Sequence, residues 1–322
     1  MAKPADGPAG DGPTMTTLQL PTIAVVTPSH NHGRFIGATV RSVIDQAYPR
    51  LDYFVADGAS TDDTIATLKS FGPAVRWVSE PDRGQADAIN KGFARTQGEI
   101  LGWLNSDDLY SPGALAAVAD SFARNPDVGV VYGNADFIDA AGKFIRPCAH
   151  VEPFARDRLL HYSDFLVQPA VFFRRELFES AGGLDAGLHW AMDYDLWLRM
   201  AEKARFVHLP RVLAKYRWLG ESKTGSGGRA RLAEIKSVAM RHGASGLPAY
   251  FRLEAVRLNL AEGIAAARRG RVDLVAARSA EAAMNVLTSP RAMASLFSMR
   301  TWRIILTGQR LRQAARSQSV SA

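Results

Sequence analysis

Between residues 22 and 125, short apolar runs alternate with longer segments in which apolar residues recur every three or four positions. Runs rich in β-branched and aromatic residues, which are typical of buried strands, lie at 22–27, 51–57, 74–79 and 99–105. Helical spacing is found at 34–48, 61–71, 85–96 and 112–125. Ser111 and Pro112 are expected to be the N-cap and the first residue of the last of these helices. Strands that alternate with helices predict an α/β fold with a mostly parallel sheet flanked by helices.

The pattern is less regular after Pro126. Single strands are expected at 128–133, 143–147, 205–210 and 211–218. A loop-rich stretch from 148 to 164 is expected to precede a strand and short helix at 169–183, and a further helix is expected at 191–204.

The chain is expected to have three parts. Residues 1–20 are rich in Gly, Pro and Ala and lack the apolar stretch of a secretory signal, so a disordered lead-in is expected. The α/β pattern assigns 21–224 to one domain. The breaker-rich segment 220–228 ends this pattern, and the helix-forming residues after it predict a helical C-terminal extension over 225–322.

Charge is unevenly distributed along the chain. Residues 1–240 carry 26 Lys and Arg against 28 Asp and Glu, whereas residues 241–322 carry 13 Arg and 4 acids. The net charge of +7 therefore comes from the C-terminal part, which argues against a nucleic-acid-binding core. The single cysteine, Cys148, excludes an intramolecular disulfide and favours a cytoplasmic location. No stretch approaches the roughly 18 apolar residues of a membrane span.

The basic excess includes a segment that could lie on a membrane. Residues 291–322 contain six Arg and no acid, and apolar residues recur there at helical spacing. Such a helix predicts peripheral contact with the anionic inner face of a membrane. Packing of this apolar stripe on the main domain is the simpler alternative.

Polar clusters follow each of the first four predicted strands: PSHN at 28–31, DGAS at 57–60, EPDRGQ at 80–85 and NSDD at 105–108. In an open α/β sheet, ligands bind just beyond the carboxyl ends of the strands. Each cluster also has a local explanation. The STDD segment 60–63 matches a helix capping box, and Asp57-Gly58 fits a simple turn.

Asp107 and Asp108 are adjacent acids at the end of a buried strand. Like charges this close repel and raise each other's pKa unless a cation lies between them. Their negative charge could interact favourably with the positive N-terminus of the next helix. Ser111 and Pro112, however, are expected to start that helix. A metal site is therefore the preferred interpretation.

Four segments, taken in order, resemble the family-two glycosyltransferases with the Rossmann-like GT-A fold. They are VVTPSHNHGRFIGATVRSVIDQAYPRLDYFVADGASTDDT, SEPDRGQADAINKG, WLNSDD and MDYDLWLR, and the resemblance runs from about Ile23 to Thr224. It implies transfer of a sugar, with inversion, from a nucleotide-sugar (most commonly UDP-linked) to the hydroxyl of a saccharide or lipid-linked acceptor. Cell-surface polysaccharide or glycolipid synthesis is the expected process.

The resemblance also implies roles for individual residues. Asp107 and Asp108 resemble the DXD-type pair that holds Mg²⁺ or Mn²⁺ against the diphosphate, although the sequence does not assign which acid ligates directly. Asp57 resembles the nucleoside-contacting acid. The remaining donor-binding candidates are Pro28, His30, Asn31, Arg83, Gln85, Asp87 and Asn105.

The MDYD segment supplies the candidate general base. Asp193 and Asp195 lie two positions apart on a helix, so they point to different faces and only one is expected in the site. The family position of the base falls on Asp193, where Met192 replaces the usual preceding Glu. Favourable acids in a first helical turn are the alternative explanation.

The segment YRWLGESKT departs from the family, since relatives often have His where this chain has Leu219. Alternative phosphate-binding side chains are Arg217, Ser222 and Lys223. Two other functions are alternatives. A sugar nucleotidyltransferase would share the sheet and acids but would have a Gly-rich phosphate loop near the first strand. A non-catalytic nucleotide-sugar-binding module would lack the base.

Overall fold

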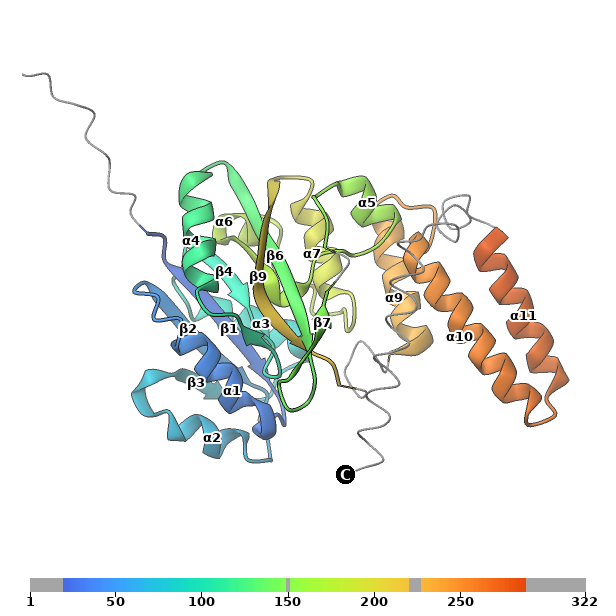
Figure 1. Ribbon diagram of the computed structural model, residues 1–322, viewed down its shortest axis with the longest axis horizontal. Coiled ribbons are helices and arrows are strands. Elements are labelled where there is room, and N and C mark those ends of the chain that lie inside the picture. The colour runs from blue at the N-terminus through green and yellow to red at the C-terminus, as the bar shows by residue number, and fades with distance from the viewer. Residues whose placement is uncertain (1–19, 149–150, 220–226, 288–322) are drawn as a thin grey trace, which may run out of the picture.

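The computed structural model describes residues 20–148, 151–219 and 227–287 (Figure 1). Its strands are β1 (Ile23–Ser29), β2 (Leu51–Asp57), β3 (Arg76–Ser79), β4 (Ile100–Trp103), β5 (Leu109–Tyr110), β6 (Val128–Ile138), β7 (Phe144–Pro147), β8 (Val171–Arg174) and β9 (Arg205–Arg217). Its helices are α1 (Gly33–Ile44), α2 (Thr64–Ser70), α3 (Gln85–Ala94), α4 (Ala114–Arg124), α5 (Arg156–His161), α6 (Arg175–Ser180), α7 (Met192–Met200), α9 (Gly228–Arg241), α10 (Ala249–Ala267) and α11 (Val272–Leu287). Two 3₁₀ turns are η1 (Gly72–Ala74) and η2 (Gln168–Ala170).

The strands of the described residues form one sheet in the order β3-β2-β1-β4-β8-β6-β9-β5, with β7 paired to β6. The first four strands are parallel, which confirms the α/β prediction for the N-terminal half. β8 runs antiparallel to both β4 and β6, so the whole sheet is mixed. Because β8 is reversed relative to both neighbours, β4 and β6 have their carboxyl ends on the same side.

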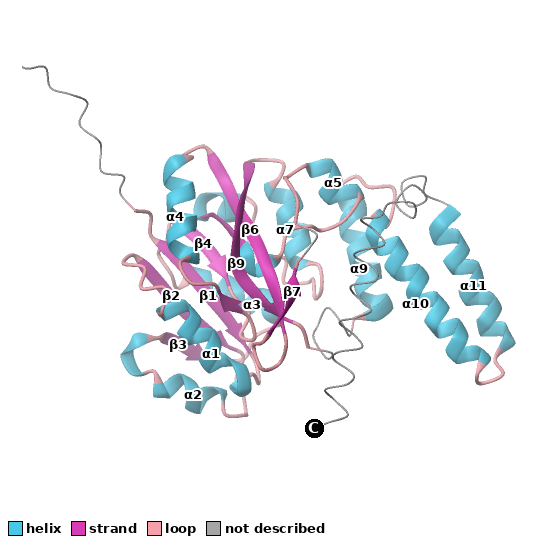
Figure 2. Cartoon of the chain, in the orientation of Figure 1, coloured by secondary structure: helices cyan, strands magenta, loops and turns pink. Residues whose placement is uncertain are grey.

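Both faces of the sheet are covered by helices (Figure 2). Ile23 and Val25 of β1 pack in a cluster with residues of α1 and α4, whereas Ala24 and Val26 pack in a second cluster with residues of α3, α6 and α7. This division follows from the alternation of side chains along a strand. All seven residues of β1 are buried, as expected for a strand covered on both faces.

Several local predictions differ from the structure. Helix α4 begins at Ala114 after Gly113, so the predicted N-cap role of Ser111 is wrong. The Ser111 N–H instead donates to the carbonyl oxygen of Leu213 at 2.9 Å, which extends the β5–β9 pairing. A single strand, β9, replaces the two expected at 205–210 and 211–218, and α5 lies within the stretch expected to be loop. The two-residue strand β5 was not predicted.

The helical C-terminal extension is present in the described residues as α9, α10 and α11 (Figure 1). Arg229 of α9 pairs with Glu262 of α10 at 2.9 Å and with Glu281 of α11 at 3.0 Å. No described helix is both long enough and apolar enough to cross a membrane. The predicted lead-in, apart from Leu20, and the basic segment 291–322 lie outside the described residues.

Candidate active site

A residue in an unusual backbone conformation connects the ends of β1 and β2. Asn31 has a φ of 54°, a left-handed conformation that Asn adopts more readily than most residues. Its N–H donates to Ser60 Oγ at 2.7 Å, and its side-chain oxygen accepts from the N–H of Thr61 at 2.8 Å. The segment 28–31, which contains donor-binding candidates, is therefore held against the loop that follows β2.

Asp57 is buried at the end of β2, with 2% of its surface exposed. One carboxylate oxygen accepts from the Ser60 hydroxyl, and the other accepts from the Ser60 N–H at 2.9 Å and from the Ser79 hydroxyl, at the end of β3, at 2.6 Å. The carbonyl oxygen of the next residue, Gly58, lies 2.9 Å from Nδ1 of His30. The ends of three strands thus meet around Asp57, and its carboxylate has a defined orientation.

The STDD segment caps a helix start, as the sequence suggested, but Asp62 and not Ser60 supplies the acceptor. Asp62 accepts from the N–H of Thr64, the first residue of α2, at 3.0 Å and from the N–H of Gly33, the first residue of α1, at 2.8 Å. Ser60 is bound to Asp57 and does not complete a capping box. Asp62 therefore connects the first residue of α1 to the first residue of α2.

The two acids after β4 have different surroundings. Asp108 is 1% exposed, and its carboxylate accepts from the backbone N–H of Arg217 at 2.8 Å and from the Asn105 amide at 3.3 Å. Asp107 is half-buried, and no other described residue donates a hydrogen bond to its carboxylate. Burial and the charge of Asp107 raise the pKa of Asp108 well above its usual range, and burial also raises the pKa of Asp107. Asp107 is thus the acid available to an external cation.

Three side-chain amides connect the loop after β3 to the end of β4. Gln85 Nε2 donates to Asn105 Oδ1 at 2.7 Å, and Asn105 Nδ2 donates to Gln168 Oε1 at 3.1 Å. Gln168, in η2, donates in turn to the carbonyl oxygen of Trp103 at 2.8 Å. This chain of hydrogen bonds orients Asn105 two residues before Asp107.

Arg217 of β9 holds the backbone of the acidic loop. Its Nε donates to the carbonyl oxygen of Asp107 at 2.7 Å, and its Nη1 donates to the carbonyl oxygens of Asp139 and Ala140 at 2.8 and 2.9 Å. Nε and Nη1 of Arg217 are therefore engaged within the protein, although the sequence offers Arg217 as a phosphate-binding side chain in place of the His that relatives have at Leu219. The other two alternatives, Ser222 and Lys223, lie outside the described residues.

Asp87, in the first turn of α3, is held by two basic residues. It pairs with Arg83 at 3.1 Å and with Lys91 at 2.9 Å, and it also accepts from the Arg83 N–H at 3.0 Å. The hydrogen bonds from Arg83 and Lys91 lower the pKa of Asp87 to about 2. Asp87 therefore organises the β3–α3 loop and leaves the side chain of Arg83 80% exposed.

Replacing Asp87 with Asn is expected to lower the melting temperature at pH 7 by about 2–4 °C, the shift that about 1 kcal/mol causes in a domain of this size. The folded-state pKa of about 2 is below the ordinary value of 3.8, so the stabilisation is complete above about pH 4 and is lost as the pH falls toward 2. The melting temperatures of wild type and Asp87→Asn, followed by circular dichroism, should therefore converge as the pH falls from about 4 toward 2. A constant difference down to pH 2 would contradict the assignment.

The two acids of α7 are engaged differently. Asp195 is 3% exposed and is bound by Arg199 at 2.8 Å and by His242, just beyond the end of α9, at 3.1 Å. Burial alone would raise the pKa of Asp195, but the hydrogen bond from His242 and the charge of Arg199 outweigh it and lower the pKa. Asp193 is half-buried. Its charge, together with the burial of Asp164, raises the pKa of Asp164 well above its usual range. Asp195 is thus a structural anchor, and Asp193 stays the candidate base.

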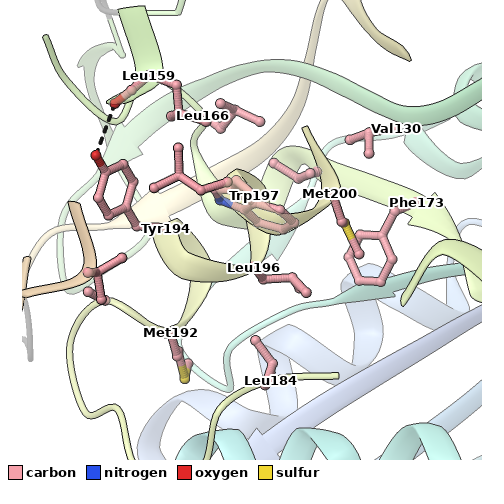
Figure 3. Packing of buried hydrophobic residues seen from close by; sticks show 14 of the residues in the cluster. Val130, Leu159, Leu166, Phe173, Leu184, Met192, Tyr194, Leu196, Trp197 and Met200 are labelled. Carbon is pink, nitrogen blue, oxygen red and sulfur yellow. Dashed lines mark hydrogen bonds between the residues drawn. The ribbon is translucent and has the colours of Figure 1, made fainter. Parts of the chain in front are cut away.

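Aromatic packing joins α7 to β4, the strand that precedes the acidic pair. Figure 3 shows Trp197 of α7 and Phe173 of β8 in this apolar cluster. The rings of Trp197 and Trp103 stack with centroids 5.4 Å apart, and Phe173 of β8 contacts both. Trp103 lies four residues before Asp107, and Trp197 lies four residues after Asp193. In Figure 1, α7 runs opposite to β9, so it begins on the side where β6 and β9 end. A rigid apolar contact therefore fixes the two candidate catalytic elements relative to each other.

The residues around Asp107 fit a divalent cation bound together with a diphosphate. No group of three or more His, Cys, Asp and Glu side chains forms a metal-binding cluster in the described part of the chain. Mg²⁺ at phosphate sites is commonly held by one or two carboxylates, with substrate oxygens and water completing its shell. Asp107 and Asp108 meet that requirement, because no other described residue donates a hydrogen bond to the carboxylate of Asp107, and the buried carboxylate of Asp108 lies beside it.

Sequence reasoning missed several contributors to the site. Thr39 of α1 donates to the carbonyl oxygens of Ser106 and Asp108 at 2.9 and 2.8 Å, and His32 Nδ1 lies 2.6 Å from Ser106 Oγ. His32 directly follows the PSHN cluster, so its position was a usable signal. Gln168 had no such signal, because it precedes a later strand and reaches the loop only through the fold.

Comparison with known proteins identifies the family. The model of Glycosyl transferase family 2 matches residues 24–182. An uncharacterized glycosyltransferase of Mycobacterium tuberculosis is 32% identical over 200 residues, covering 61% of this chain and 75% of that protein. The chain belongs to glycosyl transferase family 2. The chondroitin synthase of Escherichia coli is 26% identical to this glycosyltransferase over 200 residues, which cover 61% of the chain but only 29% of the synthase.

Solved glycosyltransferase structures confirm the fold. The structure of residues 1–349 of S. aureus TarS is 16% identical, with a TM-score of 0.56, and the match covers 72% of this glycosyltransferase and 69% of that TarS chain. A mannosyltransferase of Pyrobaculum calidifontis is 21% identical, with a TM-score of 0.55, covering 94% and 85% of the two chains. Helix α7 and the C-terminal helices lie beyond the residues that the family model matches.

Proposed function

We propose that this glycosyltransferase transfers a sugar from a nucleotide-sugar to an acceptor hydroxyl with inversion and with the help of a divalent metal. The packing of α7 onto β4 carries the proposal, because it links the helix whose second residue is Asp193 to the strand that precedes the acidic pair. The donor-side residues are His30, Asn31, Asp57, Arg83, Gln85, Asp87 and Asn105, with Pro28 in the same segment.

In the proposed reaction, Asp193 accepts the proton of the acceptor hydroxyl. The acceptor oxygen forms a bond to the anomeric carbon as the bond from that carbon to the diphosphate oxygen breaks, and both electrons leave with the nucleoside diphosphate. Attack opposite to the leaving group inverts the anomeric configuration. Mg²⁺ or Mn²⁺, when bound, neutralises the charge that develops on the diphosphate. Asp107 would ligate it directly, while Asp108 holds the loop through Arg217 and Asn105.

The relatives suggest which donors to test first. The TarS structure contains UDP-GlcNAc, and the mannosyltransferase structure contains GDP-Man and Mn²⁺. UDP-linked sugars are our preferred donors and GDP-mannose the second. An acceptor in cell-surface polysaccharide or glycolipid synthesis accords with the chondroitin synthase relative. A cytoplasmic location with contact at the inner membrane face stays a prediction, since 291–322 lie outside the described residues.

Nucleotide-sugar binding is expected to stabilise the fold. At a ligand concentration of about 100 Kd the gain is about 2.7 kcal/mol, which corresponds to a rise in melting temperature of about 5–10 °C. A thermal-shift panel of UDP- and GDP-sugars, with Mn²⁺ and with EDTA, measures this. A rise that does not depend on Mn²⁺ would contradict the metal assignment.

Turnover tests the reaction itself. With the stabilising donor and a panel of saccharide acceptors, acceptor-dependent release of nucleoside diphosphate is expected. Release of pyrophosphate from a nucleoside triphosphate and a sugar phosphate would instead indicate a nucleotidyltransferase. Binding without any turnover would indicate a non-catalytic module.

A further inference from the structure

A glutamate of the C-terminal extension contacts the segment that precedes the candidate base. The carboxylate of Glu234, on α9, accepts hydrogen bonds from the backbone N–H groups of three consecutive residues, His189, Trp190 and Ala191. The shortest nitrogen–oxygen distances are 3.0, 2.6 and 2.7 Å, respectively. Helix α7 begins at the next residue, and Asp193 is its second residue.

These contacts hold the backbone at the start of α7, where the local sequence supplies no capping side chain. The first N–H groups of an α-helix have no partner within the helix and are usually capped by a nearby side chain. The N-cap of α7 is Ala191, which makes no side-chain cap hydrogen bond. A carboxylate is a strong acceptor and is favoured by the positive end of the helix. Of the three N–H groups, only that of Ala191, the N-cap, belongs to the unpaired donors at the start of α7, and the other two lie just before the helix. Glu234 therefore fixes the backbone that leads into α7, from a helix more than 40 residues away in the sequence.

Helix α9 holds α7 at a second place. His242, just beyond the end of α9, lies 3.1 Å from Asp195, and Arg241 lies 3.9 Å from the same carboxylate. Leu232 and Ile235 of α9 belong to the apolar cluster that includes Trp197 of α7. Because this apolar packing does not involve Glu234, changing Glu234 is expected to leave the two helices together.

We propose that Glu234 is a positioning residue for the candidate base: it fixes the segment 189–191 that leads into α7 and so places the carboxylate of Asp193. The proposal rests on the proposed function and extends it to a helix that the family model does not cover. Misplacement of a reacting group by about 1 Å can reduce the rate by about 10²-fold. Donor binding, which depends on the strand ends, does not require Glu234.

The test compares Glu234→Gln and Glu234→Asp with a matched control, Glu262→Gln, which removes ion pairs of α10 with Arg229 of α9 and Arg278 of α11 without touching α7. In Glu234→Gln, kcat is expected to fall about 10- to 100-fold with the donor KM unchanged. Amide hydrogen exchange at 189–191 should become faster, since three donors lose a charged acceptor. Glu234→Asp should recover part of the rate, and Glu262→Gln should match wild type.

Several outcomes would overturn the proposal. They are an unchanged kcat in Glu234→Gln, an equal loss in Glu262→Gln, and a rise in donor KM that accounts for the whole effect. If Glu234→Gln fails to fold, Glu234→Asp decides, because wild-type kcat and wild-type exchange in that variant with a shorter side chain would overturn the positioning role. If the wild-type protein transferred sugar from none of the donors, the proposed function would be overturned together with the positioning role. Failure of the positioning role alone would leave transfer by the wild-type protein intact, so the two failures are distinguishable.

Discussion

Asp193→Asn is expected to bind donor as the wild type does and to transfer sugar about 10²–10⁴-fold more slowly, the contribution typical of general-base catalysis. Asn has nearly the same shape as Asp but does not accept a proton from the acceptor hydroxyl. The measurement is kcat for nucleoside diphosphate release at saturating acceptor, together with calorimetric titration of donor in the presence of Mn²⁺. Equal loss of donor affinity would assign Asp193 to donor binding instead.

Asp195→Asn is the matched control, because it makes the same chemical change two residues later on the same helix. Its carboxylate is bound to Arg199 and His242, so the variant is expected to lose thermal stability. Its effect on the transfer rate, measured well below the melting temperature, should be much smaller than that of Asp193→Asn. The opposite ranking would mean that Asp195 is the base.

Asp107→Ala is expected to abolish the Mn²⁺-dependent part of nucleoside diphosphate binding and to keep the fold. The loss should be at least about 10–100-fold in affinity, since even changes beyond the direct ligands cost that much at metal sites. The melting temperature without ligand should stay near the wild-type value, because no other described residue donates a hydrogen bond to this carboxylate. Calorimetry of Mn²⁺ with UDP or GDP gives the affinity.

Asp108→Ala separates ligation from support. Removing this carboxylate leaves the buried N–H of Arg217 without its acceptor, which should destabilise the fold by about 1–3 kcal/mol. A lower melting temperature is therefore expected for Asp108→Ala but not for Asp107→Ala. If Asp108→Ala alone removed metal-dependent binding at unchanged stability, the roles of the two acids would have to be exchanged.

The elements of the N-terminal half were predictable because their signals are local. The alternation of β-branched runs and amphipathic segments identified β1 to β4 and the helices between them, and the polar clusters marked the strand ends. Gly102 of β4 lets the ring of Phe172 approach the backbone, since a Cβ there would lie 2.7 Å from that ring. The start of α4 was missed, because the backbone of Ser111 is bound to Leu213, about a hundred residues later in the chain.

The sequence by itself determined which residues carry the candidate chemistry: the acidic pair after β4, Asp57 after β2 and the acids of α7. Only the tertiary structure distinguished the members of each pair. Asp108 differs from Asp107 because Arg217, 109 residues away, donates to it, and Asp195 differs from Asp193 because His242 of the extension does. The hydrogen bonds from residues 189–191, which lead into α7, to Glu234 are likewise contacts between distant segments. Periodicity and turn residues report on neighbours along the chain, whereas hydrogen-bond partners are decided by which distant segments pack together.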